Sequence, residues 1–256
     1  MSSALLATTD LSVQAGERML LAGLNLELRP GDFIAVLGRN GCGKSLTLHT
    51  LAGLRAAAAG RVELSGRELH ELGRGEIARR LAFLPQDRED TLPLSVFETA
   101  LLGRHPHIGW LRGESASDVR IVSAALARMG VDNCAARALG TLSGGEQRRA
   151  AMAGLLAQEP QVFLLDEPTN HLDPHHQVDV LLAFRERCAH GAAVIATLHD
   201  PALAERCADR VLLMYGDGRW RLGPTAELLN AAELSLLYAT PMNELSGGGR
   251  RAFIPA

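Results

Sequence analysis

The chain has 256 residues, of which 47% are hydrophobic, 21% are charged and 4% are aromatic, a composition typical of a folded globular protein. Its 26 basic and 29 acidic residues nearly balance, which argues against a polycation that binds nucleic acid. No apolar run approaches the roughly 18 residues of a membrane span, and the first residues lack the pattern of a signal peptide, so we expect a cytosolic protein.

Cysteines and histidines give no sign of a metal centre. The cysteines are scattered along the chain without a close pair, so we expect reduced thiols at Cys42, Cys134, Cys188 and Cys207. The histidine pairs in "GRHPH" and "DPHHQ" lack cysteine or carboxylate partners at ligand spacing, which favours solvated side chains.

The first strong motif is a glycine-rich loop between a predicted buried strand, Phe33 to Leu37, and a helix that begins at about Lys44. Glycines let backbone N–H groups surround phosphate oxygens, while Lys44 reaches the β- and γ-phosphates and the Ser45 hydroxyl can ligate Mg²⁺. The alternative is a plain turn, but strand, loop and helix follow one another as phosphate binding requires. The predicted phosphate loop consists of Gly38, Arg39, Asn40, Gly41, Cys42, Gly43, Lys44 and Ser45.

One residue of this loop is a cysteine, Cys42. Backbone N–H groups and Lys44 favour anions there, and such a setting can lower the pKa of a thiol. We therefore expect Cys42 to react with alkylating agents.

A short strand, "LAFLPQD", ends at Gln86. A glutamine in this position is commonly a surface residue when it is considered alone. Its amide could also reach the Mg²⁺ site or the attacking water, at a joint where the next segment swings.

The stretch from about Glu89 to Glu159 is predicted to be helical. "SVFETALLGRH", "SDVRIVSAALARMG" and "GEQRRAAMAGLLAQE" each carry apolar residues at three- and four-residue spacing. This helical insertion explains why Lys44 and Asp166 lie far apart in the sequence, although we expect their strands to be neighbours in the sheet.

The last of these helices begins in "TLSGGEQRRA", where Ser143 and Glu146 can form a reciprocal capping box. Capping alone does not call for Gly144 and Gly145, which cost helix stability. Glycines there leave backbone N–H groups uncovered at the positive end of a helix, which favours a second anion site.

Two carboxylates follow the buried run Val162 to Leu165 in "QVFLLDEPTNHLD". A parallel strand delivers its last residues to the ligand edge of the sheet, beside the phosphate loop. Asp166 is therefore placed to hold Mg²⁺ through water, and Glu167 to orient or deprotonate the water that attacks the γ-phosphate. The residues indicate hydrolysis of a nucleoside triphosphate.

The next buried strand, "AAVIATLHD", ends at His199. A lone histidine at a strand end is often structural, but this one falls at the same sheet edge as Asp166 and Glu167. We expect it to contact the γ-phosphate. The end of the chain, "SGGGRRAFIPA", is expected to be loose.

Taken together, these motifs resemble the ATP-binding cassette family, the ATPase subunits of ABC transporters. The resemblance runs from about residue 5 to 240 and includes "GRNGCGKS", Gln86, "LSGGEQ", "VFLLDE", "NHLD" and His199 in the family's order. It implies an α/β fold, a phosphate-loop NTPase (RecA-like) core with an N-terminal antiparallel β part and an inserted helical subdomain. The implied parts are a core at 1–88 and 160–240, a helical subdomain at 89–159 and a C-terminal tail at 241–256.

The resemblance also implies cofactors and partners. ATP and Mg²⁺ would bind at the phosphate loop, with Ser45, Gln86 and Asp166 at the metal. Two subunits would pack head to tail, so that Ser143, Gly144 and Gly145 bind the γ-phosphate held by the partner, most simply a second copy. The motor would drive separate permease subunits at the cytoplasmic face of the inner membrane, served by a periplasmic or surface substrate-binding protein.

Three further stretches indicate a branch of this family. "RRLAFLPQ", "ETALLGRHPHIG" and "TNHLDPHHQ" look most like the branch that imports iron-siderophores, haem, cobalamin or related chelates. A soluble ABC protein acting on ribosomes or DNA, or an ABC subunit for another cargo, is the alternative, but the chain lacks the tandem cassettes or coiled-coil insertion of the soluble proteins, so no nucleic-acid partner is expected. The family usually stacks adenine on an aromatic residue at the position of Ala15, which predicts loose base selectivity here.

Overall fold

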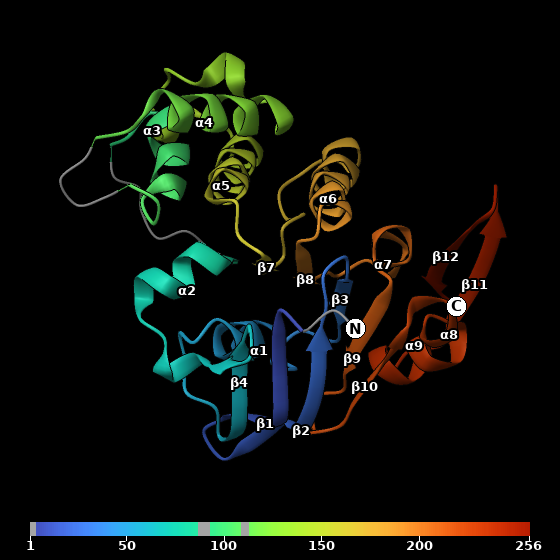
Figure 1. Cartoon of the computed structure of the whole chain (residues 1–256). Helices are drawn as coiled ribbons and strands as arrows, with labels where there is room; N and C mark the ends of the chain where they lie inside the picture. Colours follow the sequence, from blue (N-terminus) through green and yellow to red (C-terminus); the bar gives the residue numbers. More distant parts are fainter. Residues whose placement is uncertain (1–3, 87–92, 109–112) are drawn as a thin grey trace.

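The computed structural model describes residues 4–86, 93–108 and 113–256, and it builds its lower part from two sheets (Figure 1). The first sheet is antiparallel, in the order β2-β1-β4-β5. Its strands are β1 (Leu6–Ala15), β2 (Arg18–Leu28), β4 (Ala59–Leu64) and β5 (Arg67–Glu68). Apolar cross-strand pairs, among them Leu6 with Leu28, bury one face of it. This sheet is the predicted antiparallel N-terminal part.

The second sheet has the order β10-β9-β3-β8-β7-β6 and is parallel except for β10. Its strands are β3 (Phe33–Leu37), β6 (Leu81–Leu84), β7 (Val162–Leu165), β8 (Ala193–Thr197), β9 (Arg210–Met214) and β10 (Trp220–Pro224). Every residue of β3, β7 and β8 is buried, as expected for parallel strands covered on both faces. The expectation that β3 and β7 are neighbours is wrong, because the chain returns through a helix to place β8 between them.

Helices cover these sheets and form a separate group at the top of Figure 1. The helices are α1 (Lys44–Leu51), α2 (Arg74–Arg80), α3 (Val96–Leu101), α4 (Ala116–Arg128), α5 (Gly144–Gln158), α6 (Pro174–Ala189), α7 (Pro201–Cys207), α8 (Thr225–Leu228) and α9 (Ala231–Tyr238), with 3₁₀ turns at η1 (Leu69–Glu71), η2 (Leu102–Arg104), η3 (Asp132–Cys134) and η4 (Leu139–Thr141). Among the described residues, no helix combines the length and apolar character needed to cross a bilayer.

The upper group contains α3, α4 and α5, which lie where the sequence predicts helices. Each of the three begins with a capping box, made by Ser95 with Glu98, Ser115 with Asp118, and Ser143 with Glu146. The expected start of this group at Glu89 lies outside the described residues.

A buried arginine and a glycine hold the three helices together. Arg104 Nε donates to Asp118 Oδ1 at 2.8 Å, and its Nη1 donates to the carbonyl of Ala157 on α5. A Cβ on Gly103 would lie 2.0 Å from the carbonyl oxygen of Gly154, so only glycine permits this approach of the chain to α5.

The end of the chain is ordered, so the expectation of a loose tail is wrong. β11 (Met242–Gly247) and β12 (Arg250–Pro255) form a hairpin that lies beside α7 at the right of Figure 1. Arg251 Nε contacts Glu205 Oε1 of α7 at 2.7 Å, and Phe253 is only 8% exposed. The glycines that suggested disorder form the tight turn, where Gly248 and Gly249 have positive φ.

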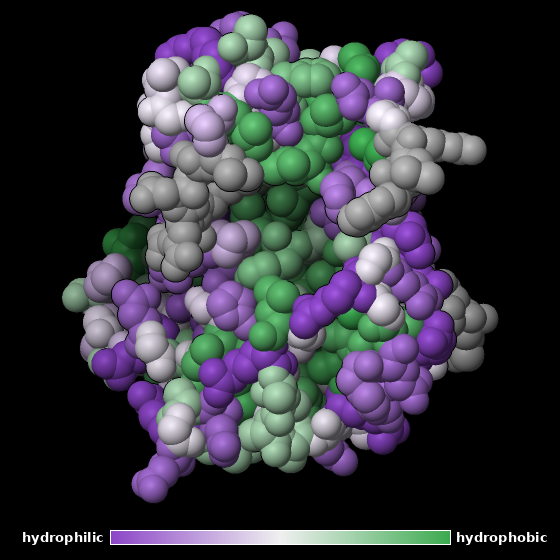
Figure 2. Space-filling model, turned by 90° about the vertical axis from the view of Figure 1, so that its left-hand side faces the viewer, coloured by the Kyte–Doolittle hydropathy of each residue, from purple (hydrophilic) through white to green (hydrophobic). Residues whose placement is uncertain are grey.

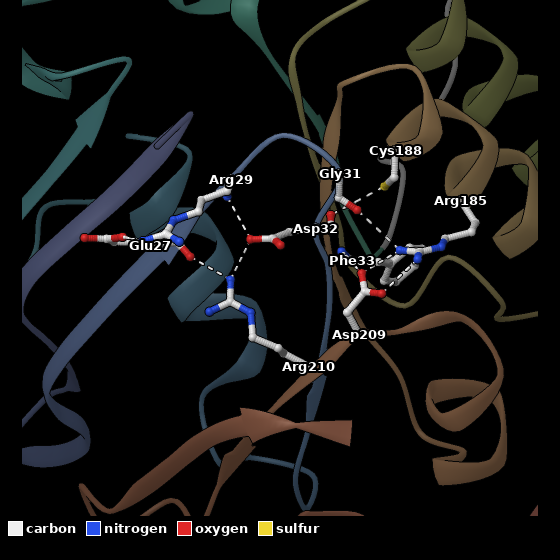
Figure 3. A network of polar contacts seen from close by, with 9 residues as sticks. All are labelled: Glu27, Arg29, Gly31, Asp32, Phe33, Arg185, Cys188, Asp209 and Arg210. Carbon is white, nitrogen blue, oxygen red and sulfur yellow. Dashed lines mark hydrogen bonds and ion pairs between the residues drawn. The ribbon is translucent and has the colours of Figure 1, made fainter. Parts of the chain in front are cut away.

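Two arginine–carboxylate pairs lie at the amino end of β3 (Figure 3). We call Asp32, Arg185, Asp209 and Arg210 the basal clamp. Arg210 Nη2 lies 2.7 Å from Asp32 Oδ2 and also donates to the carbonyl of Glu27 at the end of β2. Arg185 of α6 forms two bonds to the Asp209 carboxylate, which also accepts the backbone N–H of Phe33 at 2.9 Å. The clamp therefore fixes the first sheet, β3, β9 and α6 to one another.

Candidate functional site

The predicted phosphate loop connects the carboxyl end of β3 to α1. Gly41 and Gly43 have φ of 74° and 103°, in the region that favours glycine. A Cβ on Gly38 would lie 2.5 Å from the carbonyl oxygen of Met214, so the loop passes too close to β9 for a side chain. Gly43 precedes α1 without a side-chain cap from any described residue, which leaves the first N–H groups of α1 available to an anion.

Lys44 is folded over this loop and is only 5% exposed. Its ammonium Nζ donates to the carbonyl oxygens of Gly38 at 2.9 Å and Arg39 at 3.4 Å, and no carboxylate of residues 4–86, 93–108 or 113–256 pairs with it. Neutral carbonyls offset the charge of a buried cation less than an anion does. Lys44 is therefore poised for a phosphate group.

The two carboxylates after β7 have different partners. Asp166 is completely buried, and its Oδ1 accepts from the Thr197 hydroxyl at 2.7 Å. Its Oδ2 is buried and has no hydrogen-bond partner among the described residues. A buried, unpaired carboxylate oxygen is costly unless a cation meets it. Hard oxygen ligands suit Mg²⁺, so Asp166 together with Ser45 and Gln86 fits that ion.

Glu167 lies beside His199, as predicted from their places at one sheet edge. Its Oε1 is 2.7 Å from His199 Nε2, and its Oε2 accepts from the Asn170 amide. Glu167 is 6% exposed and has a left-handed φ of 48°, a strained backbone for a side chain of this kind. The surrounding contacts hold this carboxylate in a single place on the cavity wall.

Gln86 is exposed and follows β6 after one residue, Pro85. Its Oε1 accepts from the Ser45 hydroxyl at 3.4 Å, which brings two of the predicted metal-site residues together. Asp87, which follows it in the quoted motif, lies outside the described residues.

One cavity of about 530 Å³ collects most of the predicted residues. The loop contributes Asn40, Gly41, Gly43, Lys44 and Ser45 to its wall, and Gln86, Glu167 and His199 complete that side. Ala15, Arg18 and Leu20 of the first sheet form another wall. Asp166 is not among the residues that line this cavity, and its side chain is completely buried.

The residues of the "LSGGEQ" motif, which we call the signature residues, do not line this cavity. Ser143, Gly144 and Gly145 line a second one of about 410 Å³, together with Arg149, His171 and His176, among others. The predicted capping box is present: Glu146 N donates to Ser143 Oγ at 3.3 Å, and Ser143 N donates to Glu146 Oε2 at 2.9 Å. The structure thus separates the two predicted anion sites on one chain.

Arg148 was missed in the sequence, although it connects the two sites. This α5 residue is 6% exposed, and its Nη1 donates to the carbonyls of Pro85 at 2.7 Å and Gln86 at 3.0 Å. Its Nη2 donates to the carbonyls of Asp166 and Glu167. An arginine on the helix face that also carries buried alanines was the signal that could have revealed it.

The expectation of a reactive Cys42 is wrong. Its side chain is only 2% exposed, and burial raises the pKa of the Cys42 thiol despite the opposing effect of the Lys44 charge. A Cβ on Gly38 would lie 2.6 Å from its sulfur, which shows how closely the loop packs on it. The thiol fills space beneath the loop.

Comparison with known proteins identifies relatives of the chain. Residues 9–170 match the ABC transporter family. A hemin import ATP-binding protein, HmuV of Streptomyces coelicolor, is 41% identical over 93% of this chain and 84% of its own length. The petrobactin import ATP-binding protein FpuD of Bacillus anthracis is 34% identical over 96% and 95%. A solved ABC transporter assigned to the metal-chelate type, in an inward-facing conformation, superimposes with a TM-score of 0.85 at 28% identity, covering 99% of this chain and 98% of the other.

Proposed function

We propose, from the premise that this chain belongs to the ABC transporter family, that it is the ATP-hydrolysing subunit of an importer for a metal chelate. As a member of that family it binds ATP and is an ATPase. The observation that carries hydrolysis is the Glu167 carboxylate, held beside His199 on the same cavity wall as Lys44 and Ser45.

The residues of this cavity divide the work. The phosphate loop and Lys44 bind the β- and γ-phosphates, which displaces the Lys44 ammonium from the carbonyls of Gly38 and Arg39. Glu167 orients and deprotonates the attacking water, and His199 positions that carboxylate through the 2.7 Å contact. When bound, Mg²⁺ would neutralise charge on the phosphates, held by Ser45, Gln86 and Asp166.

The second anion site calls for a partner subunit. Ser143, Gly144 and Gly145 border a cavity distinct from the phosphate loop, so a nucleotide on this chain's loop does not use it. Head-to-tail packing of two copies would bring the start of α5 in each copy against the γ-phosphate held by the other copy. We therefore propose a homodimer with two composite sites.

Mixing two inactive variants tests this shared site. Lys44→Ala damages ATP binding on its own loop, and Ser143→Arg blocks the partner's site. In a mixed dimer, one interface carries both lesions and the other carries none, so mixing should restore part of the ATPase activity. Complete subunit exchange without recovered activity would contradict the composite site.

The permease is proposed to dock on the face seen in Figure 2. There, a band of apolar side chains runs down the molecule and is hollowed near its middle. Half-buried apolar residues on elements of this side include Phe83 of β6, at the edge of the second sheet, and Phe97 and Leu101 of α3. Gln86 lies in the chain between β6 and α3. A movement of Gln86 when nucleotide binds or leaves would therefore reach a permease docked at the cytoplasmic side of the membrane.

The cargo is proposed to be a metal chelate such as hemin or a ferric siderophore, delivered by a substrate-binding protein. The names of the relatives support this class, and the motifs around Gln86, Arg104 and His171 point to the same branch. Affinity purification from native membranes tests both partners. We expect a polytopic permease and a chelate-binding protein; a permease for another cargo class would contradict the cargo, and ribosomal proteins alone would contradict the transporter.

A further inference from the structure

One wall of the cavity at the phosphate loop consists of residues that are not expected to contact phosphate groups. Lys44, Ser45 and Glu167 surround the triphosphate, while Ala15 and Arg18 come from the first sheet. The nucleoside of a bound nucleotide must lie against that remaining wall. This step rests on the proposed ATPase function.

The guanidinium of Arg18 is held as a fixed plane in this wall. Its Nε and Nη2 both donate to the carbonyl oxygen of Gly216, at 3.1 Å and 2.7 Å. Two bonds from one edge of the group to a single acceptor fix its plane and leave its faces open. Arg18 is exposed, so a face is accessible from the cavity.

The acceptor of these bonds is itself packed on the phosphate loop. Gly216 has a φ of 77°, and a Cβ there would lie 2.9 Å from Cys42 Cβ and 3.3 Å from Arg18 Nη2. The turn between β9 and β10 therefore fits tightly between the loop and the arginine. This contact sets the distance from the guanidinium plane to the phosphate loop.

We propose that Arg18 is the platform on which the base of the nucleotide stacks. Arginine planes stack on nucleobases and add a cation–π attraction. None of the described residues that line this cavity is a phenylalanine, tyrosine or tryptophan, and the small Ala15 leaves room beside the guanidinium. Because every base has a π-face, the platform supports ATP and GTP alike, and base selectivity is weak.

Calorimetry with two probes, ATP and tripolyphosphate, tests the platform in EDTA, where no hydrolysis occurs. Arg18→Ala should weaken ATP binding roughly 5- to 150-fold, the range seen for loss of one stacked base, and leave tripolyphosphate affinity nearly unchanged. Arg18→Lys keeps the charge without the plane, so it should lose nearly as much ATP affinity. Ala15→Tyr in the Arg18→Ala background should recover affinity by supplying a new surface.

Arg55→Ala is the matched control. Like Arg18, this arginine donates to a backbone carbonyl, here that of Gln14 in β1, but it lines a different cavity, so neither probe should bind differently. Equal losses of ATP and tripolyphosphate in Arg18→Ala, recovered in Arg18→Lys, would show a purely electrostatic role and overturn the platform. Unchanged ATP affinity in Arg18→Ala would also overturn it. Failure of the wild-type protein to bind either probe, in EDTA and again when the titration is repeated with Mg²⁺, would instead overturn the proposed ATPase, and the platform with it.

Discussion

The two ends of β3 carry clusters of charge with opposite characters. At the amino end, the basal clamp satisfies its carboxylates internally: Asp209 accepts from Arg185 and from the backbone of Phe33, and Asp32 accepts from Arg210 (Figure 3). At the carboxyl end, the buried Lys44 rests on neutral carbonyls, and Asp166 keeps one buried oxygen without a partner in the described part of the chain. The paired carboxylates of the basal clamp stabilise the fold, whereas the unpaired charges of Lys44 and Asp166 are available to a ligand.

The largest expected effect is on catalysis at the carboxyl end. Glu167→Gln removes the proposed general base and leaves Lys44 and Ser45 to bind ATP, so turnover should fall by ~10²–10⁴-fold while ATP binding persists. Steady-state ATPase assays and nucleotide titrations measure the two effects. The control is Glu186→Gln, which removes a surface carboxylate paired with Arg128 and should leave turnover unchanged. Near-normal turnover in Glu167→Gln would remove this residue from the role.

Replacing Arg148 should affect stability and activity together, because its hydrogen bonds support both the fold and the candidate site. Arg148→Ala removes the guanidinium donor from the carbonyls of Asp166 and Glu167, although the Glu167 carbonyl still accepts from the backbone N–H of Asn170, and each hydrogen bond from a charged group is typically worth 1.5–3 kcal/mol. Losses are not additive, so we expect a destabilisation of roughly 2–4 kcal/mol, together with reduced ATPase activity. Urea unfolding and activity measured on the folded fraction would separate the two. Loss of stability alone would show that Arg148 supports only the fold, and loss of ATPase activity alone would show that it supports only the site.

The basal clamp should affect stability alone. Asp209→Ala leaves the buried N–H of Phe33 unsatisfied, which costs about 1–3 kcal/mol. The turnover of the folded protein should stay at the wild-type level. Asp217→Ala is the control, because its exposed pair with Arg219 should contribute less than about 1 kcal/mol. A large loss of turnover in Asp209→Ala would show that the amino end of β3 communicates with the site.

The smallest expected effect is a loss of helix stability at low pH. Hydrogen bonds from the Ser95 side chain and backbone lower the pKa of Glu98, and hydrogen bonds from the Ser143 backbone and side chain lower the pKa of Glu146. A carboxylate with a lowered folded pKa stabilises the protein above its unfolded pKa, here 4.5, and loses that contribution as the pH falls through the folded value. Circular dichroism should therefore show the upper helices weakening below about pH 4.5. Glu146→Gln should reduce this acid sensitivity; an unchanged profile would contradict the assignment.

The site residues that could be predicted from the sequence are those whose position follows from the neighbouring strand or helix. Lys44 and Ser45 follow a strand and open a helix. Glu167 and His199 each come two residues after the end of a parallel strand, β7 or β8, so their contact could be inferred. Arg148 contacts carbonyls 18 to 63 residues away, and nothing near it in the sequence specifies those partners. Sheet order was likewise missed at β8, because periodicity identifies a buried strand without saying which strands flank it.

The hairpin of β11 and β12 has a practical consequence for anyone who handles this protein. It rests on α7 through Arg251 and Glu205, and α7 begins at Pro201, two residues after His199. Trimming the chain at residue 240 to remove an apparent appendage would remove a contact that supports the helix after His199. An affinity tag fused after Ala256 would likewise hang from a strand packed against the body, so the exposed turn at Gly248 is the safer place for a protease site or a label.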